Sequence, residues 1–230
     1  MHRSKRGRTV QSVQDLIRDA IVRLELKPGT FIDKKALCER LGISRFPVSE
    51  ALGRLADEGL IEVLPQHGTR VSRIDLADCR EAMFIRRALE ANVLRELAPR
   101  VTSAFLDALE LNLKEQKLAM RADDRVRFHK CDLELHDLFL SELGFDRVKA
   151  SVYAARAQLD RLRLFMCTPR RQASTFAEHR RIVDALASRD AASAGQAMER
   201  HLSVVMEELA GFAADNPDIF SNNEYVVAAE

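Results

Sequence analysis

The chain has 230 residues with a formal net charge of +1, and 47% of its residues are apolar. This apolar content is enough to bury one large core or two small ones. The chain lacks tryptophan and has only six prolines and nine glycines, which favours a mostly helical protein. It contains no long apolar run, which excludes a membrane span.

The net charge hides an asymmetry along the chain. Residues 1–75 hold 14 Lys/Arg against 10 Asp/Glu, whereas residues 76–230 hold 22 against 25. A basic N-terminal part suits a module that binds a polyanion. The four cysteines are widely spaced and form no C-x-x-C pair, and the N-terminus shows no signal-peptide pattern. We therefore expect a protein of the reducing cytoplasm, without a disulfide framework or a zinc ribbon.

The N-terminal residues 1–9 are basic and contain no acid; the basic ones are Arg3, Lys5, Arg6 and Arg8. They form either a solvated tail without fixed structure or an arm that contacts DNA phosphates, and both hold if the arm becomes ordered on DNA. Apolar residues then follow a helical period from Val10 to Leu26, and Pro28-Gly29 ends this first helix.

The next stretch, Lys34 to Leu64, has the pattern of a helix-turn-helix that runs into a strand. Gly42 suits the left-handed C-cap of the first helix, and Ser44 is placed to cap the second. One buried stripe of the second helix repeats at i, i+3, i+4 and i+7; it consists of Val48, Ala51, Leu52 and Leu55. Ile61–Leu64 and Thr69–Arg73 then predict two strands of a wing, joined by the turn Pro65–Gly68.

A helix of this kind places its exposed N-terminal side chains in the major groove of DNA. The candidates there are Ser44, Arg45, Phe46 and Ser49, with Lys35 on the preceding helix. Arg45 is the best suited to a guanine, because its planar fork matches O6 and N7. At the wing, His67, Gly68 and Arg70 are candidates for contacts to the minor groove or to phosphates.

From Leu76 onward the pattern is helical throughout, with no strand alternation and no repeat. The predicted helices are Leu76–Ala98, Ser103–Arg121, Arg125–Glu142, Arg147–Phe165, Ser174–Ser188 and Ala191–Ala214. Short connections between long helices favour an antiparallel bundle. The fold class is thus mostly α: a winged helix-turn-helix over residues 1–75 and an all-helical bundle over residues 76–230, of which 215–230 have no clear pattern.

Four residues of the bundle have the chemistry of a metal site. Asp132 and His136 lie four apart and so share one helix face, while His179 and His201 lie on two later helices. Imidazoles with one carboxylate are common ligands of a divalent ion; Zn²⁺ is our first choice, with Ni²⁺, Mn²⁺ and Fe²⁺ as alternatives. His129 shares the face of Asp132, and we expect it to pack or hydrogen-bond rather than to ligate.

The residues resemble a known family. GISRFPVSEALGRLADEGLIEVLPQHGTRV and LIRDAIVRLELKPGTFI resemble the winged helix of GntR-type bacterial regulators. EHRRIVDALASRDAASAGQAMERHL is similar to the FCD ligand-binding domain of the FadR branch. Two departures, Phe46 for threonine and Ser49 for arginine, alter the expected operator, and Phe145 replaces an asparagine in a loop.

The resemblance implies a function for the candidate residues. The family's metal ligands match Asp132, His136, His179 and His201 one for one, and its pocket binds organic acids beside the metal. Arg86 matches a family arginine that clamps an effector carboxylate; the alternative is a surface arginine that pairs with Glu90 at i+4.

We therefore expect a bacterial, nucleoid-associated transcription regulator: a homodimeric repressor that binds double-stranded operator DNA under the control of a small carboxylate. A second hypothesis is a metal sensor, in which the ion itself is the signal. A third is a metal-dependent enzyme with Glu134 or Glu178 as the base. It is the weakest, because the sequence has no H-E-x-x-H spacing, nucleophile elbow or phosphate-binding glycine loop, and we expect no enzymatic activity.

Overall fold

The computed structural model describes the backbone of residues 2–221 and the side chains of these residues other than 2–9, 157–158 and 210. The described chain forms two compact units. The first contains residues up to 76 together with 216–221, and the second contains residues 77–215. The expected division had placed 216–221 with the bundle. In the part of the chain that is described, no helix has the length and apolar content needed to cross a membrane.

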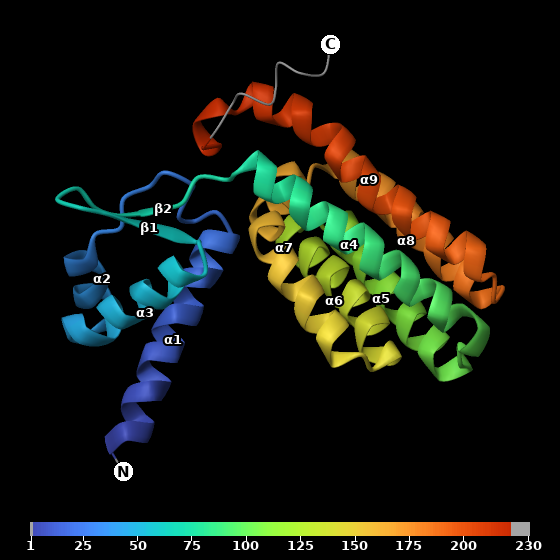
Figure 1. Ribbon diagram of the computed structural model, residues 1–230, viewed down its shortest axis with the longest axis horizontal. Helices are drawn as coiled ribbons and strands as arrows, with labels where there is room; N and C mark the ends of the chain where they lie inside the picture. The colour runs from blue at the N-terminus through green and yellow to red at the C-terminus, as the bar shows by residue number, and fades with distance from the viewer. Residues whose placement is uncertain (1, 222–230) are drawn as a thin grey trace. The chain divides into compact units, whose positions relative to one another are not determined.

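The first unit is the predicted winged helix-turn-helix (Figure 1). It consists of α1 (His2–Val22), α2 (Lys34–Leu41), α3 (Arg45–Asp57) and the hairpin of β1 (Ile61–Leu64) and β2 (Gly68–Val71). Helix α1 packs against α3, and their apolar faces meet in one core. Its most buried members include Ile17, Ile21, Val48, Ala51, Leu52 and Leu55.

Local capping residues set the helix-turn-helix geometry. The Asp33 side chain accepts hydrogen bonds from the backbone N–H groups of Lys35 and Ala36, and so begins α2. Gly42 ends α2 in the left-handed conformation, with φ of 63°, as predicted. Ser44 takes the N-cap position of α3, but its side chain makes no capping hydrogen bond. The prediction for Ser44 was therefore right for the position and wrong for the bond.

Two expectations about α1 were wrong. The helix begins at His2 rather than at Val10, so the backbone of residues 2–9 is helical. It ends at Val22 rather than at Leu26, because Leu24 adopts a left-handed conformation with φ of 63° that no α-helix continues through.

The wing hairpin is antiparallel and pairs Ile61 with Val71 and Leu64 with Gly68. β2 therefore begins one residue earlier than predicted and ends two residues earlier. Beyond it, Ile74 forms a parallel bridge with Phe220: the Ile74 N–H donates to Ile219 O and the Ser221 N–H donates to Ile74 O. Phe220 is buried there, so the end of the described chain belongs to the first unit.

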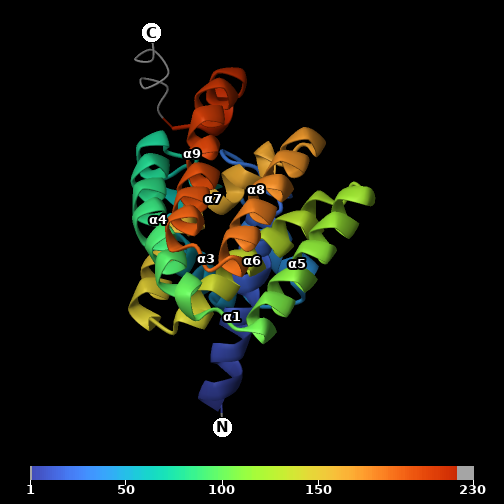
Figure 2. The same ribbon diagram turned by 90° about the vertical axis from the view of Figure 1, so that its right-hand side faces the viewer.

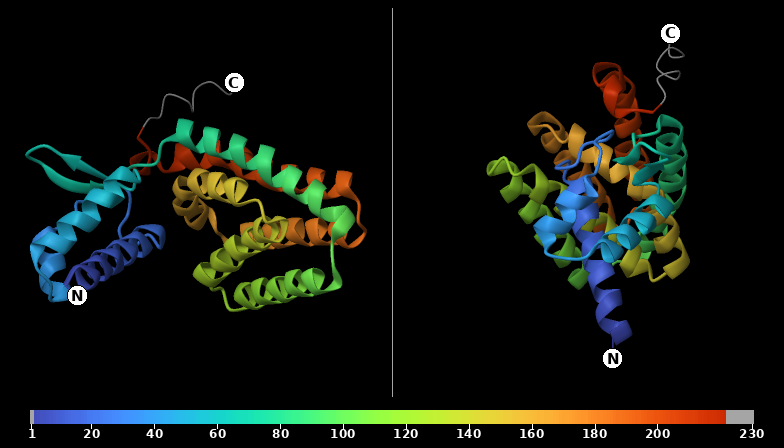
Figure 3. Two further views of the ribbon diagram at one scale, coloured as in Figure 1. Left: turned by 60° about the horizontal axis from the view of Figure 1, so that its bottom comes forward. Right: turned by 90° about the vertical axis from the view of Figure 1, so that its left-hand side faces the viewer.

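The second unit is the predicted antiparallel bundle. It consists of α4 (Leu76–Leu97), α5 (Ser103–Arg121), α6 (Arg125–Leu143), α7 (Asp146–Met166), α8 (Pro169–Ala187) and α9 (Ala191–Asp215). Helix α8 lies between α9 and α5, and α6 lies between α5 and α7. Helices α4 and α9 run side by side (Figures 2 and 3), tied by an ion pair between Arg95 and Glu199.

The predicted helix bounds agree with the structure to within one residue except at α8. This helix begins at Pro169, five residues before the predicted start at Ser174. Pro169 occupies the first turn of α8, where its missing N–H has no intrahelical partner to lose. Thr168 caps the helix by accepting from the Arg171 N–H.

Candidate metal centre and DNA-binding surface

The predicted major-groove residues lie together at the start of α3. Ser44, Arg45, Phe46 and Ser49 are all exposed, and Phe46 retains 62% of its surface. Lys35 is exposed on α2, and His67 and Gly68 are exposed at the end of the hairpin. The start of α3 and the end of the hairpin are therefore both accessible to DNA.

Arg70 lies differently from the other candidates of the wing. It stands opposite Glu62 on the hairpin, and its Nε and Nη2 lie 3.1 and 2.9 Å from Glu62 Oε2. A phosphate contact by Arg70 therefore competes with this cross-strand ion pair. Arg3 and Arg6 lie outside the described side chains.

The structure brings the four predicted metal ligands together inside the bundle. Asp132 and His136 come from α6, His179 from α8 and His201 from α9. All four are buried, and one ligand atom from each lies within 4.8 Å of the others. The Nε2 atoms of His136 and His201 are 3.3 Å apart, and His179 Nε2 lies 3.2 Å from Asp132 Oδ1.

Each imidazole is held through its other nitrogen. The Nδ1 of His136 lies 2.5 Å from Glu90 Oε2, and the Nδ1 of His201 lies 2.8 Å from Glu178 Oε2. The Nδ1 of His179 lies 2.8 Å from Gln116 Oε1. All three partners are acceptors, so Nδ1 carries the proton in each ring and donates it, which leaves the Nε2 lone pair of each ring available to a metal ion.

Each acceptor is itself fixed by a further side chain. Arg86 Nε donates to Glu90 at 2.6 Å, both terminal nitrogens of Arg171 donate to Glu178, and Asn112 Oδ1 accepts from Gln116 Nε2 at 2.7 Å. Because the Gln116 amide nitrogen is occupied by Asn112, its oxygen faces His179. Three separate chains of hydrogen bonds, one for each ring, therefore orient the three imidazoles.

This arrangement fits a divalent cation. Burial, reinforced by the neighbouring histidines, holds the pKa of His201 well below its usual range, and burial lowers the pKa of His136 despite the opposing charge of Glu90. Both rings are thus neutral near pH 7. His179 Nε2 is buried and has no hydrogen-bond partner in the described part of the chain. Imidazole nitrogen lone pairs and a carboxylate repel one another when they lie in contact, unless a cation lies among them.

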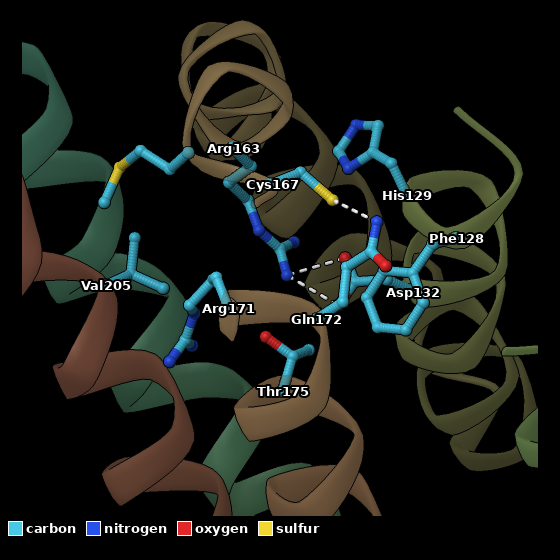
Figure 4. Close-up of a pocket in the computed structure, with 10 residues that line it drawn as sticks. Phe128, His129, Asp132, Arg163, Cys167, Arg171, Gln172, Thr175 and Val205 are labelled. Atoms are coloured by element: carbon cyan, nitrogen blue, oxygen red, sulfur yellow. Dashed lines mark hydrogen bonds and ion pairs between the residues drawn. The ribbon is translucent and has the colours of Figure 1, made fainter. Parts of the chain in front are cut away.

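Asp132 also contacts an arginine that borders a cavity (Figure 4). Nη2 of Arg163 on α7 lies 2.7 and 2.6 Å from the two oxygens of Asp132. Although burial opposes ionisation, Arg163 and the histidines hold the pKa of Asp132 well below its usual range. The cavity has a volume of about 30 Å³ and is bordered by α6, α7, α8 and α9. Asp132 and Arg163 are among its polar lining residues, with His129, Arg171, Gln172 and Thr175.

The alternative interpretation of Arg86, a surface arginine that pairs with Glu90, agrees with its contacts but not with its location. It forms the predicted ion pair with Glu90, yet it is fully buried rather than on the surface. Through Glu90 it acts on His136, and it is not among the described residues that border the cavity. His129 is buried beside the cavity, outside the four-ligand cluster, as expected. Glu134 is half-exposed and pairs with Lys130.

The residues that support the candidate ligands were not predicted from the sequence. They are Glu90, Gln116 and Glu178, which accept hydrogen bonds from the imidazoles, and Arg163, which contacts Asp132. One signal was available. Asn112 and Gln116 occupy the same apolar stripe of α5 as Leu109 and Leu113, and a polar residue on a buried stripe needs a partner. The sequence gives no sign of which partner each finds, because the partners lie on other helices.

The fold defines a winged-helix protein that carries a second, all-helical domain. Residues 9–71 match the gntR family of bacterial regulatory proteins, and residues 81–204 match the FCD domain. The chain belongs to this family, and it is a DNA-binding transcription regulator with an FCD domain.

Relatives and solved structures agree with this assignment. A helix-turn-helix transcriptional regulator from an unstable DNA locus of Streptomyces ambofaciens is 34% identical over 92% of this chain and 89% of its own length. The Escherichia coli transcriptional repressor RspR is 31% identical over 92% of this chain and 93% of its own. A GntR regulator from Rhodococcus sp. RHA1 shares the fold with a TM-score of 0.77, at 23% identity, over 89% of this chain and 98% of its own.

Proposed function

We propose that the chain is a repressor whose operator affinity is set by a small carboxylate bound beside a divalent metal ion. One observation carries the proposal: one ligand atom from each of three histidines and Asp132 come within 4.8 Å of one another next to a cavity that Arg163 borders. Repression is supported by the name of RspR, a repressor that this chain resembles over nearly its whole length.

The metal would be held by Asp132, His136, His179 and His201. Neutral imidazoles with one carboxylate suit Zn²⁺ first, and Ni²⁺, Mn²⁺ or Fe²⁺ also accept this ligand set. When bound, the ion supplies positive charge that neutralises Asp132 and attracts an anionic ligand. The carboxylate would then meet Arg163, whose planar guanidinium matches it. Arg86 keeps a supporting part, because it fixes Glu90 behind His136.

Control of DNA binding would follow from the helices that the site joins. The centre links α6, α8 and α9, so a ligand that fixes it changes the packing of the bundle. Coupling free energies between such sites are typically about 1–3 kcal/mol, or five- to 150-fold in operator affinity. Arg45 would read a base at the start of α3, and its substitution by alanine should remove operator discrimination while leaving the fold intact.

We propose a homodimer in which the outer face of α4 meets its counterpart. Phe84 retains 75% of its surface and Ile85 retains 39%, so two adjacent large apolar side chains are exposed on α4. Ala88 follows on the same face one turn later and permits close approach. Two copies would place two winged helices on a two-fold symmetric operator.

A second candidate is the metal sensor, and the size of the cavity favours it. A volume of about 30 Å³ holds one or two water-sized groups. If side chains at the cavity do not move, the ion alone would be the signal.

The test combines metal analysis with DNA binding. Purified full-length protein is analysed for metal, and its affinity is measured for a duplex selected by the protein from a random pool. We expect about one ion per chain, and a small acid that weakens DNA binding only when metal is present. A response to metal without any acid would establish the sensor instead. Absence of metal, with His136→Ala and His201→Ala behaving as wild type, would refute both.

A further inference from the structure

Phe46 is an exposed aromatic side chain in the first turn of α3, the helix whose N-terminal residues face the major groove in proteins of this class. It retains 62% of its surface, although a large apolar side chain is more stable when it is removed from water. A single exposed apolar residue is ordinary on a protein surface, so the direction in which Phe46 points decides whether it has a role.

Phe46 points away from the hydrophobic core of the winged-helix unit. Each residue of an α-helix is turned by about 100° from the one before, so Phe46 lies on the side opposite the buried stripe that contains Val48 and Leu52. Ser49, one turn after Phe46, has a short side chain. Gly53 follows two turns after Phe46 on the same outer side, with open space around the position that a Cβ atom would take. A DNA groove that receives the N-terminal half of this side therefore meets the Phe46 ring.

The chemistry of the ring limits what it recognises in DNA. A phenyl group has no hydrogen-bond donor or acceptor, so it makes none of the bonds to phosphates or polar base edges that are open to Arg45 and Ser49. The apolar group that a base presents in the major groove is the C5-methyl of thymine. A G·C pair opposite the ring loses water from its polar edge and gains no partner in exchange, which disfavours it.

We propose that Phe46 reads a thymine of the operator by packing its ring against the C5-methyl group. The inference uses the DNA-binding role of the family and goes beyond the proposed function, because it needs neither metal nor effector and assigns a second base contact to α3. The Cα atoms of adjacent residues are about 3.8 Å apart and a base-pair step is about 3.4 Å. The thymine therefore lies within about two base pairs of the base that Arg45 would contact.

The test removes the methyl group alone. Full-length protein selects its operator from a random pool of duplexes, and each thymine of the selected duplex is then replaced, one at a time, by uracil. Uracil keeps the O4 acceptor and the pairing with adenine, so only the apolar contact is lost. At the thymine that Phe46 contacts, uracil should weaken wild-type binding about fourfold, the effect of one buried methyl group, as measured by fluorescence anisotropy.

Substitutions of Phe46 assign this thymine-to-uracil ratio to its ring. In Phe46→Ala the two duplexes should bind equally well, whereas Phe46→Leu keeps an apolar side chain and should retain a ratio of about twofold or more. Phe31→Ala is the matched control, because Phe31 is 57% exposed in the same unit but borders a groove between α1 and α2. It should leave the ratio unchanged. Each substitution alters an exposed side chain, so the fold should be retained.

Two results would overturn the inference. If no thymine of the selected duplex responds to uracil, the protein does not read the methyl group. If the ratio persists in Phe46→Ala, another residue reads the methyl group, and Phe46 makes only a contact that is common to all sequences. Both results leave the proposed metal and effector control standing, because each comparison is between two duplexes with one preparation of protein.

Discussion

The Glu178 carboxylate lies between Arg171 of α8 and His201 of the candidate metal centre. Its Oε2 accepts from His201 Nδ1 and from Arg171 Nη2. Burial raises the pKa of Glu178, and the charge of Arg171 opposes this rise. The carboxylate both orients the imidazole and increases its basicity, so its removal should weaken metal binding without removing a ligand.

Glu178→Gln therefore should lower metal affinity by about ten- to a hundredfold. The measurement is competition for Zn²⁺ against a chromophoric chelator. Glu207→Gln is the matched control, because Glu207 is exposed and pairs with Arg200 on the surface of α9. Unchanged affinity in Glu178→Gln would show that the contact with His201 does not support a ligand.

The buried histidines also predict a pH dependence of the metal-free protein. The pKa values of His136 and His201 are lowered in the folded state, while an unfolded histidine titrates near 6.5. Below this pH the unfolded chain takes up protons that the folded chain resists, so the free energy of unfolding falls. The loss is up to about 1.4 kcal/mol per histidine at pH 5.5.

Melting of chelator-treated protein between pH 7.5 and 5.5 measures this loss, and the pH values are chosen to span the titration of a free imidazole at about 6.5. His67→Gln, at an exposed position of the wing, should leave the slope unchanged. A flat melting temperature over this range would show that the two rings are not held neutral.

At the scale of elements, the bridge between Ile74 and Phe220 joins the end of the described chain to the segment that follows β2. Phe220 and Ile74 are both buried, with 2% and 0% of their surfaces exposed. Two backbone hydrogen bonds of 2.9 and 3.0 Å, through the amides of Ile74 and Ser221, accompany this packing. Residues 216–221 thus contribute to the stability of the winged-helix unit.

Phe220→Ala should destabilise the winged-helix unit by about 3–5 kcal/mol, because it leaves a cavity that the surrounding residues fill only in part. Hydrogen exchange at the amides of Ile74 and Ser221 should accelerate accordingly. Phe31→Ala provides the comparison, since Phe31 is 57% exposed and should cost much less. Equal exchange rates in wild type and Phe220→Ala would mean that the bridge contributes nothing to stability.

At the scale of the whole molecule, the chain passes between its two units at residue 76 and again at residue 215. The second passage leaves directly from α9, the helix that carries His201. The α4 face proposed for dimerisation belongs to the same bundle. The proposed metal, effector and dimer contacts would therefore all act on one set of helices, and the winged-helix unit is covalently joined to that set at both passages.

Phe84→Asp should weaken dimerisation by at least about thirtyfold, because it buries a charge at the centre of the proposed interface. Light scattering after gel filtration would show whether the mass falls from twice the 26.0 kDa of one chain to a single chain. Phe145→Asp changes a similarly exposed phenylalanine at the start of α7 and should leave the mass unchanged. A dimeric Phe84→Asp protein would exclude the α4 face.

Features that depend on near neighbours along the chain could be predicted from the sequence alone. Asp33 begins α2 and Gly42 ends it, through contacts within four residues. Apolar periodicity located every helix of the bundle. The four candidate metal ligands were also predicted from the sequence, through its family resemblance. Their convergence is geometric, and the structure shows it.

Contacts between distant segments could not be predicted from the sequence and are seen in the folded chain. Glu90 and Gln116 reach His136 and His179 across 46 and 63 residues, and Phe220 reaches the linker after the wing. The same holds for Arg163 beside Asp132. Periodicity and capping report on one helix at a time, whereas these partners are chosen by the packing of different helices against each other. The support of the metal centre and the shape of its cavity are therefore properties of the fold.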